Sequence, residues 1–243
     1  MKKKHKKPFY KQFLKLRVNI QNRSKIFNFK KHKWLSFQNY AKRQLKFFKR
    51  YKVKDQFRLY TVKFASRGNS LQKKFRNNLQ QKKLFNLFYG GLNQKYFKNT
   101  VLKSINTKKH LRKNSLDNRH DVIRLFESRL DTVLYRTGFV LSIKEARQFL
   151  LHKHVRINNC LVTKGSYLLR SNDLIQVVDN KKPRNSVKLN LTKFNFWPVP
   201  PNHLMINYKT LQILFLDQNS VNSFPIFNHY LNINSIVSNA KRW

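Results

Sequence analysis

The clearest periodic pattern of apolar positions in the chain begins near residue 127 and runs to residue 178. Leu130, Val133 and Leu134 are spaced by three and four residues, which is the spacing of one helix face. Gly138 follows this stripe, where a helix C-terminus favours a residue that adopts a left-handed backbone. The pattern therefore predicts a helix that ends before Gly138.

A second helix is predicted to begin after Ser142. Ser142 and Glu145 match a capping box, with serine as the N-cap and glutamate at the third helical position. Ile143, Ala146 and Leu150 then fall on one face, while the other side of the helix is mostly polar. This segment therefore reads as an amphipathic helix whose apolar side faces a core.

A short hairpin is predicted after the second helix. Residues 155–157 alternate apolar and basic side chains, as a half-buried strand does. Asn158 and Asn159 fit a tight turn because asparagine tolerates a positive φ. Residues 161–162 return the hairpin, and residues 173–177 form a further short strand. Two helices and a small sheet make residues 127–180 a compact α+β module.

The remainder of the chain is less regular. Residues 1–79 are predicted to be a basic arm with short helical stretches, one of which carries Trp34 and Phe37 on one face. Residues 80–126 are predicted to be a helical region and linker, interrupted at Tyr89-Gly90-Gly91. Residues 181–243 form a C-terminal extension.

Positive charge is unevenly divided along the chain. The sequence carries 53 Lys and Arg against nine Asp and Glu, for a formal charge of +44. Residues 1–119 hold 36 of these bases and only two acids, whereas residues 120–180 hold nine bases and six acids. A segment so charged repels itself unless a polyanion neutralises it. The charge therefore indicates a nucleic acid partner, and the nearly neutral segment is the part able to fold alone.

Other features of the composition narrow the class of protein. A single cysteine, Cys160, excludes a disulfide within the chain and a cysteine-based zinc site. His152 and His154 are two residues apart, which we expect to point them away from each other, so no metal site is predicted. There is no run of about 18 uncharged apolar residues and no apolar signal core, so neither a membrane span nor secretion is expected.

Residue usage also bears on the origin of the chain. Lys outnumbers Arg 36 to 17, and the chain has 28 Asn and 21 Phe. Lys, Asn and Phe have AT-rich codons, so we expect an AT-rich genome and interpret the chain as organelle-encoded. No amphipathic transit peptide is recognised at the N-terminus.

Residues 127–180 resemble the RNA-binding module named after small-subunit ribosomal protein four. The residues that carry the resemblance are Ser128–Phe139, Lys144–Leu150, His152-Lys153, Val155–Asn158, Ser166-Tyr167 and Asn172–Ile175. Lys82–Leu92 is similar to the helix and Tyr-Gly break that precede the module in that ribosomal protein. Asn207–Thr210, which follows His203-Leu204, resembles the C-terminal segment of mitochondrial members.

The resemblance implies a structural protein of the mitochondrial small ribosomal subunit, with no catalysis and no cofactor. Family members bind the 5′ domain of small-subunit rRNA and lie near the mRNA entrance, beside small-subunit proteins three and five. In the family the module is inserted between a helical region and a C-terminal segment that packs back on that region. We therefore expect residues 190–215 to pack on residues 80–104.

The family pattern also implies which side chains contact RNA. Double-helical RNA is recognised mainly through its shape, phosphates and 2′-hydroxyls, which basic side chains on a rigid frame can reach. The predicted RNA-binding residues are Arg129, Arg136, Lys144, Arg147, Gln148, His152, Lys153, Arg156 and Asn158. The alternative for each is a solvated surface charge or, for Arg129, a local ion pair with Asp131 or Glu127.

Three other functions share some of these features. The module also occurs in pseudouridine synthases, and Arg129-Leu130-Asp131 superficially matches their catalytic triplet, but only 63 residues follow position 180. A free-standing RNA-binding or ribosome-recycling factor is the second alternative. A protein of anionic membrane surfaces is the third, although no helix separates its lysines cleanly from its aromatic residues. A plastid location is the alternative to a mitochondrial one.

Overall fold

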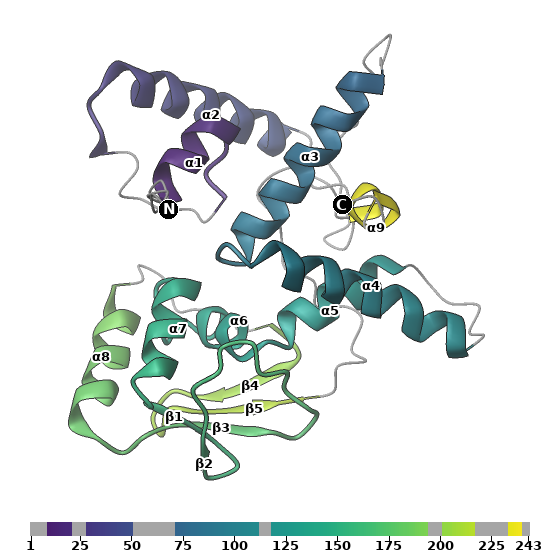
Figure 1. Cartoon of the computed structure of the whole chain (residues 1–243). Helices are drawn as coiled ribbons and strands as arrows, with labels where there is room; N and C mark the ends of the chain where they lie inside the picture. Colours follow the sequence, from purple (N-terminus) through teal and green to yellow (C-terminus); the bar gives the residue numbers. More distant parts are fainter. Residues whose placement is uncertain are drawn as a thin grey trace, which may run out of the picture. The chain divides into compact units, whose positions relative to one another are not determined.

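The computed structural model describes residues 9–20, 28–50, 71–111, 118–193, 201–216 and 233–239. The chain divides into two compact units, whose elements are drawn in Figure 1. Unit 1 comprises Met1–Phe88 with Ile226–Asn239, and unit 2 comprises Tyr89–Pro225 with Ala240–Trp243. The boundary between them falls at the glycine-rich break predicted after Phe88. The four-part division of the sequence is finer than this and stays a prediction.

The described part of unit 1 is built from α-helices joined by short non-helical segments. Its helices are α1 (Phe9–Leu16), α2 (His32–Arg50), α3 (Leu71–Phe88) and α9 (Ile233–Asn239). Trp34 and Phe37 are both buried on α2, as their spacing predicted, and Trp34 lies 4.8 Å from Phe29 between ring centroids. Helix α9 contacts α3, so one part of the C-terminal segment does return to the helical region.

Unit 2 combines helices with a small antiparallel sheet, which confirms the α+β class. Its helices are α4 (Gln94–Leu111), α5 (Asn118–Glu127), α6 (Leu130–Arg136), α7 (Ile143–Leu151) and α8 (Lys181–Thr192). Its strands are β1 (Val155–Ile157), β2 (Cys160–Leu161), β3 (Leu174–Val177), β4 (Leu204–Asn207) and β5 (Gln212–Phe215), in the order β2-β1-β3-β5-β4. Figure 1 shows α6 and α7 side by side over one face of this sheet.

The turns and the helix cap predicted from local sequence signals are observed in the structure. Gly138 has a φ of 77°, and Asn158 and Asn159 make the β1–β2 turn with φ values of 47° and 68°. The hydroxyl of Ser142 accepts a hydrogen bond from the backbone N–H of Glu145 at 3.2 Å. The carboxylate of Glu145 in turn accepts one from the N–H of Leu141 at 2.9 Å. Helix α7 therefore begins where the capping box placed it.

The core of unit 2 lies between the helices and the sheet. Apolar side chains of α6, α7, β1, β3 and β5 form one buried cluster. In the sheet Ile175 is aligned with Ile157 on one side and with Ile213 on the other, so a row of isoleucines faces the helices. Alternate residues of β1, β3 and β5 are buried, which is the two-residue period of a half-covered sheet.

The position of the segment 190–215 corrects the sequence-based expectation. We expected it to pack on residues 80–104, but residues 204–215 form a hairpin that extends the sheet of the module, with β5 paired to β3. The physical reason is that β3 would otherwise end the sheet with unpaired backbone groups. Residues 212–215 carry the same alternation of buried and half-buried side chains as β3, so pairing also enlarges the apolar face.

His203 lies at the start of this hairpin with only 7% of its surface exposed. Its ring packs edge-on against Phe215, with 5.8 Å between centroids. Burial lowers the pKa of His203 below its ordinary value of 6.5, and the charge of Arg136 lowers it further, while Glu127 opposes both. The folded chain therefore disfavours a proton on His203.

This burial predicts a pH-dependent stability. Because the unfolded chain binds the His203 proton more tightly, the free energy of unfolding should fall as the pH drops below about 6.5. The substitution His203→Gln removes the titration, so urea unfolding of the variant should show a shallower loss between about pH 7 and pH 5. Parallel pH profiles for the two chains would show that His203 titrates as it does in water.

Candidate nucleic-acid interface

Helix α7 presents its polar side to solvent. Lys144 and Gln148 are four residues apart and therefore share a helix face, and both are exposed. His152 and Lys153 are exposed where the helix ends. The opposite side of the helix packs into the core. The structure thus brings four of the nine predicted RNA-binding residues to one helix and its C-terminal end.

The hairpin contributes two more of the predicted residues. Val155 and Ile157 are buried, whereas Arg156 between them is exposed on the face of the sheet away from the core. Arg156 is aligned with Leu161 on one side and Gln176 on the other. Arg156 is therefore presented on a surface different from the outer face of α7.

Asn158 has a structural role in addition to its exposure. Its side-chain amide donates a hydrogen bond to Asp173 at 3.0 Å, and its side-chain oxygen accepts one from the N–H of Leu174 at 3.0 Å. These bonds fasten the β1–β2 turn to the start of β3. The left-handed backbone of Asn158 therefore comes with a side chain that stabilises the turn.

The remaining three predicted residues are arginines with partners inside the chain. Arg129 is 3% exposed and makes two parallel hydrogen bonds to Asp131, from Nε at 3.0 Å and from Nη2 at 2.8 Å. Its guanidinium carbon also lies 4.9 Å from the ring centroid of Tyr96. The local ion pair with Asp131, which was the alternative for Arg129, is the arrangement observed.

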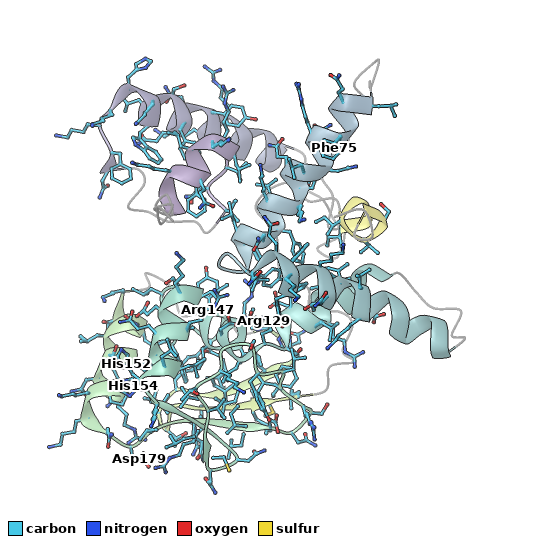
Figure 2. The ribbon with its side chains drawn as sticks, viewed as in Figure 1. Phe75, Arg129, Arg147, His152, His154 and Asp179 are labelled. Carbon is cyan, nitrogen blue, oxygen red and sulfur yellow. The ribbon has the colours of Figure 1, made fainter. Side chains whose placement is uncertain are left out.

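Arg147 joins the module to the break before α4. Its Nε donates to Asp131 at 2.7 Å, while its two terminal nitrogens donate to the backbone oxygens of Gly90 and Tyr89, each at 3.0 Å. Asp131 is completely buried, and it accepts hydrogen bonds from two arginines at once. The position of Arg147 in Figure 2, beside Arg129, reflects this shared carboxylate.

The arginine of α6 forms a second buried network. Arg136 donates to both carboxylate oxygens of Glu127, each at 3.0 Å, and the hydroxyl of Tyr89 donates to the same carboxylate at 2.8 Å. Burial lowers the pKa of Arg136, but the carboxylate of Glu127 outweighs this effect and the net pKa is raised. Burial and the neighbouring Glu127 raise the pKa of Tyr89 well above its ordinary value. Arg136 therefore stays charged and Tyr89 stays neutral.

Both networks hold Tyr89, through its backbone oxygen in the first and its hydroxyl in the second, and the first also holds the backbone oxygen of Gly90. Gly90 has a φ of 74°, and a Cβ built on it would lie 2.8 Å from a methyl carbon of Ile143. Only glycine fits this close approach without displacing Ile143. Sequence reasoning placed a helix break here but did not foresee its attachment to Arg147. The sequence did contain a signal for these networks: a chain of charge +44 has few acids, so Glu127 and Asp131 were candidates to pair with nearby arginines.

The two histidines correct another expectation. We expected His152 and His154 to point apart, but their ring centroids are 5.8 Å apart and the rings are nearly parallel, as their neighbouring positions in Figure 2 suggest. Lys153 between them has a φ of 60°, so the segment follows neither helix nor strand geometry. Burial lowers the pKa of His154, and a charge on His152 lowers it further.

Comparison with known proteins identifies the module. The S4 domain family matches residues 128–175, which span α6, α7, β1, β2 and the first half of β3. This chain contains an S4 domain. The resemblance inferred from the sequence is thereby confirmed, and the residues that carried it fall within or beside the matched segment.

Relatives extend the similarity beyond the S4 domain. The chain is 28% identical over 169 residues to small ribosomal subunit protein uS4m of Reclinomonas americana, covering 68% of this chain and 64% of the relative. It is 29% identical over 159 residues to uS4m of Marchantia polymorpha, covering 65% and 76%. It is 36% identical over 104 residues to uS4 of Pelagibacter ubique, covering 43% and 47%. The chain thus spans less than two thirds of the length of two of these three relatives.

The geometry predicts that Arg147 stabilises the fold, whereas the exposed Lys144 on the same helix does not. Arg147→Ala removes one of two arginines from a buried carboxylate and leaves two backbone oxygens without their donors. We expect the free energy of unfolding to fall by about 2 kcal/mol. Lys144→Ala, on the exposed face of the same helix, should change it by no more than about 0.5 kcal/mol. Urea unfolding followed by far-ultraviolet circular dichroism measures both.

We expect the opposite order of effects when RNA affinity is measured for the same two variants. At a temperature where both chains are folded, Lys144→Ala should weaken binding to a duplex RNA, whereas Arg147→Ala should bind as the unaltered chain does. An Arg147→Ala chain of unchanged stability and reduced affinity would contradict the structural role of this arginine.

Proposed function

We propose that this chain is a structural constituent of the mitochondrial small ribosomal subunit, where it binds small-subunit rRNA and supports assembly of the subunit. The observation that carries the proposal is the S4 domain within a chain similar to proteins named small ribosomal subunit protein uS4m. The charge of +44 supports it independently, since a soluble chain with this charge needs a polyanion as its partner.

The S4 domain supplies a preformed frame for this binding. Lys144, Gln148 and Arg156 are exposed on rigid elements, so they need little reordering to reach phosphate and ribose oxygens. The arginines paired within the chain, Arg129, Arg136 and Arg147, act indirectly, because they fix α6, α7 and the Tyr89-Gly90 break relative to one another. We keep as candidates for direct contact the six exposed residues: Lys144, Gln148, His152, Lys153, Arg156 and Asn158.

Most of the electrostatic attraction comes from outside the S4 domain. Residues 1–119 carry 36 bases and two acids. Each cation placed on a phosphate releases condensed counterions, which gives affinity with little dependence on base sequence. The S4 domain then fixes the orientation on the rRNA, while the basic arm supplies affinity. Small-subunit proteins three and five and mRNA near its entrance are the further partners that family resemblance supports.

The site geometry argues against the enzymatic alternative. In a pseudouridine synthase the aspartate of the Arg-Leu-Asp triplet must reach the substrate base. Here Asp131 is completely buried and accepts hydrogen bonds from both Arg129 and Arg147. An aspartate fixed in this way cannot attack a nucleotide. We therefore propose a role without catalysis.

The location rests on the relatives. Proteins named uS4m support a mitochondrial ribosome, and the codon usage inferred from composition supports an organellar gene. The plastid alternative is favoured by one observation, a 39% identity over 83 residues to uS4c of Monoclea forsteri, which covers 34% of this chain and 41% of the relative. The longer similarity to uS4m makes the mitochondrial location the proposal.

Sedimentation distinguishes a ribosomal constituent from a free-standing factor. Organelle lysate is separated on a sucrose gradient at moderate salt, and the chain is quantified against other small-subunit proteins by mass spectrometry. We expect the chain to migrate with mitochondrial small subunits at a ratio near one, because many phosphate contacts hold it there. Its recovery mainly in the soluble fractions, or with plastid subunits, would contradict the proposal.

A further inference from the structure

A pocket of about 830 Å³ lies within unit 1, on the described helices α1 and α2 of Figure 1. Helix α1 and its C-terminal end contribute Leu14 and Arg17, and α2 contributes the rest of the lining. This volume lies within the range of pockets that hold small organic ligands. None of the residues that line the pocket is acidic.

The lining from α2 follows the helical repeat. Lys33, Phe37, Tyr40 and Arg43 are spaced by three and four residues, so they share one face of α2. Phe37 is buried at 3% exposure, while Tyr40 is 38% exposed. The pocket therefore presents an accessible aromatic ring one helical turn from a guanidinium group.

Arg17 enters the pocket from a strained backbone. Its φ is 54°, and it follows the last turn of α1, where the N–H of Val18 bonds to the oxygen of Phe13 and that of Arg17 to the oxygen of Leu14. Glycine is the favoured residue at such a position because it has no Cβ. An arginine kept here at a conformational cost is explained if its side chain is needed in the pocket.

These polar groups lack partners within the described part of the chain. The structure gives the side chains of Arg17, Tyr40 and Arg43 no hydrogen bond or ion pair there. The sequence offers few acidic partners for these arginines, since residues 1–119 contain only two acids. The pocket thus combines an exposed ring with uncompensated positive charge.

We propose that this pocket takes one unpaired nucleotide of RNA, with the base stacked on Tyr40 and the adjoining phosphates on Arg17 and Arg43. Aromatic rings bind unpaired bases by stacking, and arginine grips phosphate with parallel hydrogen bonds. An acidic peptide would satisfy the cations but would leave the ring of Tyr40 without a stacking partner. The inference rests on the proposed RNA-binding function and adds a site for unpaired nucleotides in unit 1.

Binding of two RNA probes to the full chain tests the site. The probes are a fluorescent oligouridylate of about 12 nucleotides and an RNA duplex of about 16 base pairs. Tyr40→Ala should weaken binding of the oligouridylate about tenfold, because base stacking is lost, and Tyr40→Phe, which keeps the ring, should bind normally. Binding of the duplex should be the same for both variants.

Matched variants separate the pocket from general charge. Arg43→Ala should weaken oligouridylate binding more than Lys42→Ala, which removes a neighbouring exposed charge outside the lining. Arg17→Gly should bind the oligouridylate more weakly while its thermal unfolding temperature is unchanged or higher, because glycine relieves the strained backbone. A loss of affinity without a loss of stability is the result expected for a binding residue.

Photo-crosslinking locates the nucleotide. RNA that contains 4-thiouridine should crosslink to a peptide that includes Tyr40, and Tyr40→Ala should remove this crosslink.

The proposed site is wrong if Tyr40→Ala, Arg43→Ala and Arg17→Gly all bind the oligouridylate as the unaltered chain does. That result would leave the proposed function standing. Displacement of the oligouridylate by polyglutamate at equal charge concentration would assign the pocket to acidic peptides instead. An unaltered chain that binds neither probe would reject the proposed function itself.

Discussion

Positive charge in large excess over negative charge is the constraint on which the rest of this structure depends. The chain has nine acids for 53 bases, so few of its cations can be neutralised internally. Two of the nine acids, Glu127 and Asp131, are buried in unit 2 and hold three arginines between them. The S4 domain can therefore fold because its own acids neutralise some of its arginines. The cations outside it have few acidic partners in the chain and need a polyanion to neutralise them.

The placement of these two acids also decides how the S4 domain is joined to the preceding segment. Asp131 and Arg147 fix the backbone of Tyr89 and Gly90, and Glu127 fixes the hydroxyl of Tyr89. Buried charges of this kind need complete pairing, because a charge left without its partner costs several kcal/mol. The break at Gly90 is thus held by the same buried carboxylates that pair the arginines of α6 and α7.

Much of this architecture could be predicted from local sequence signals, and the failures have physical causes. Ser142 with Glu145, Gly138 and the two asparagines at 158 and 159 each encode a backbone geometry within a few residues. The pairing of β5 with β3 could not be predicted in this way, because it depends on an edge about 40 residues earlier in the chain. The same holds for Arg147, whose partners at Tyr89 and Gly90 are 58 and 57 residues away.

The most direct test of the charge argument is the salt dependence of RNA binding by the full chain and by a chain without residues 1–79. If about ten cations contact phosphate, the logarithm of the association constant should fall by about 7 to 9 units per unit of log salt concentration. Removing residues 1–79 should flatten this slope by far more than Lys144→Ala, which removes about one contact. A slope near zero for the full chain, or an unchanged slope after the deletion, would contradict the account.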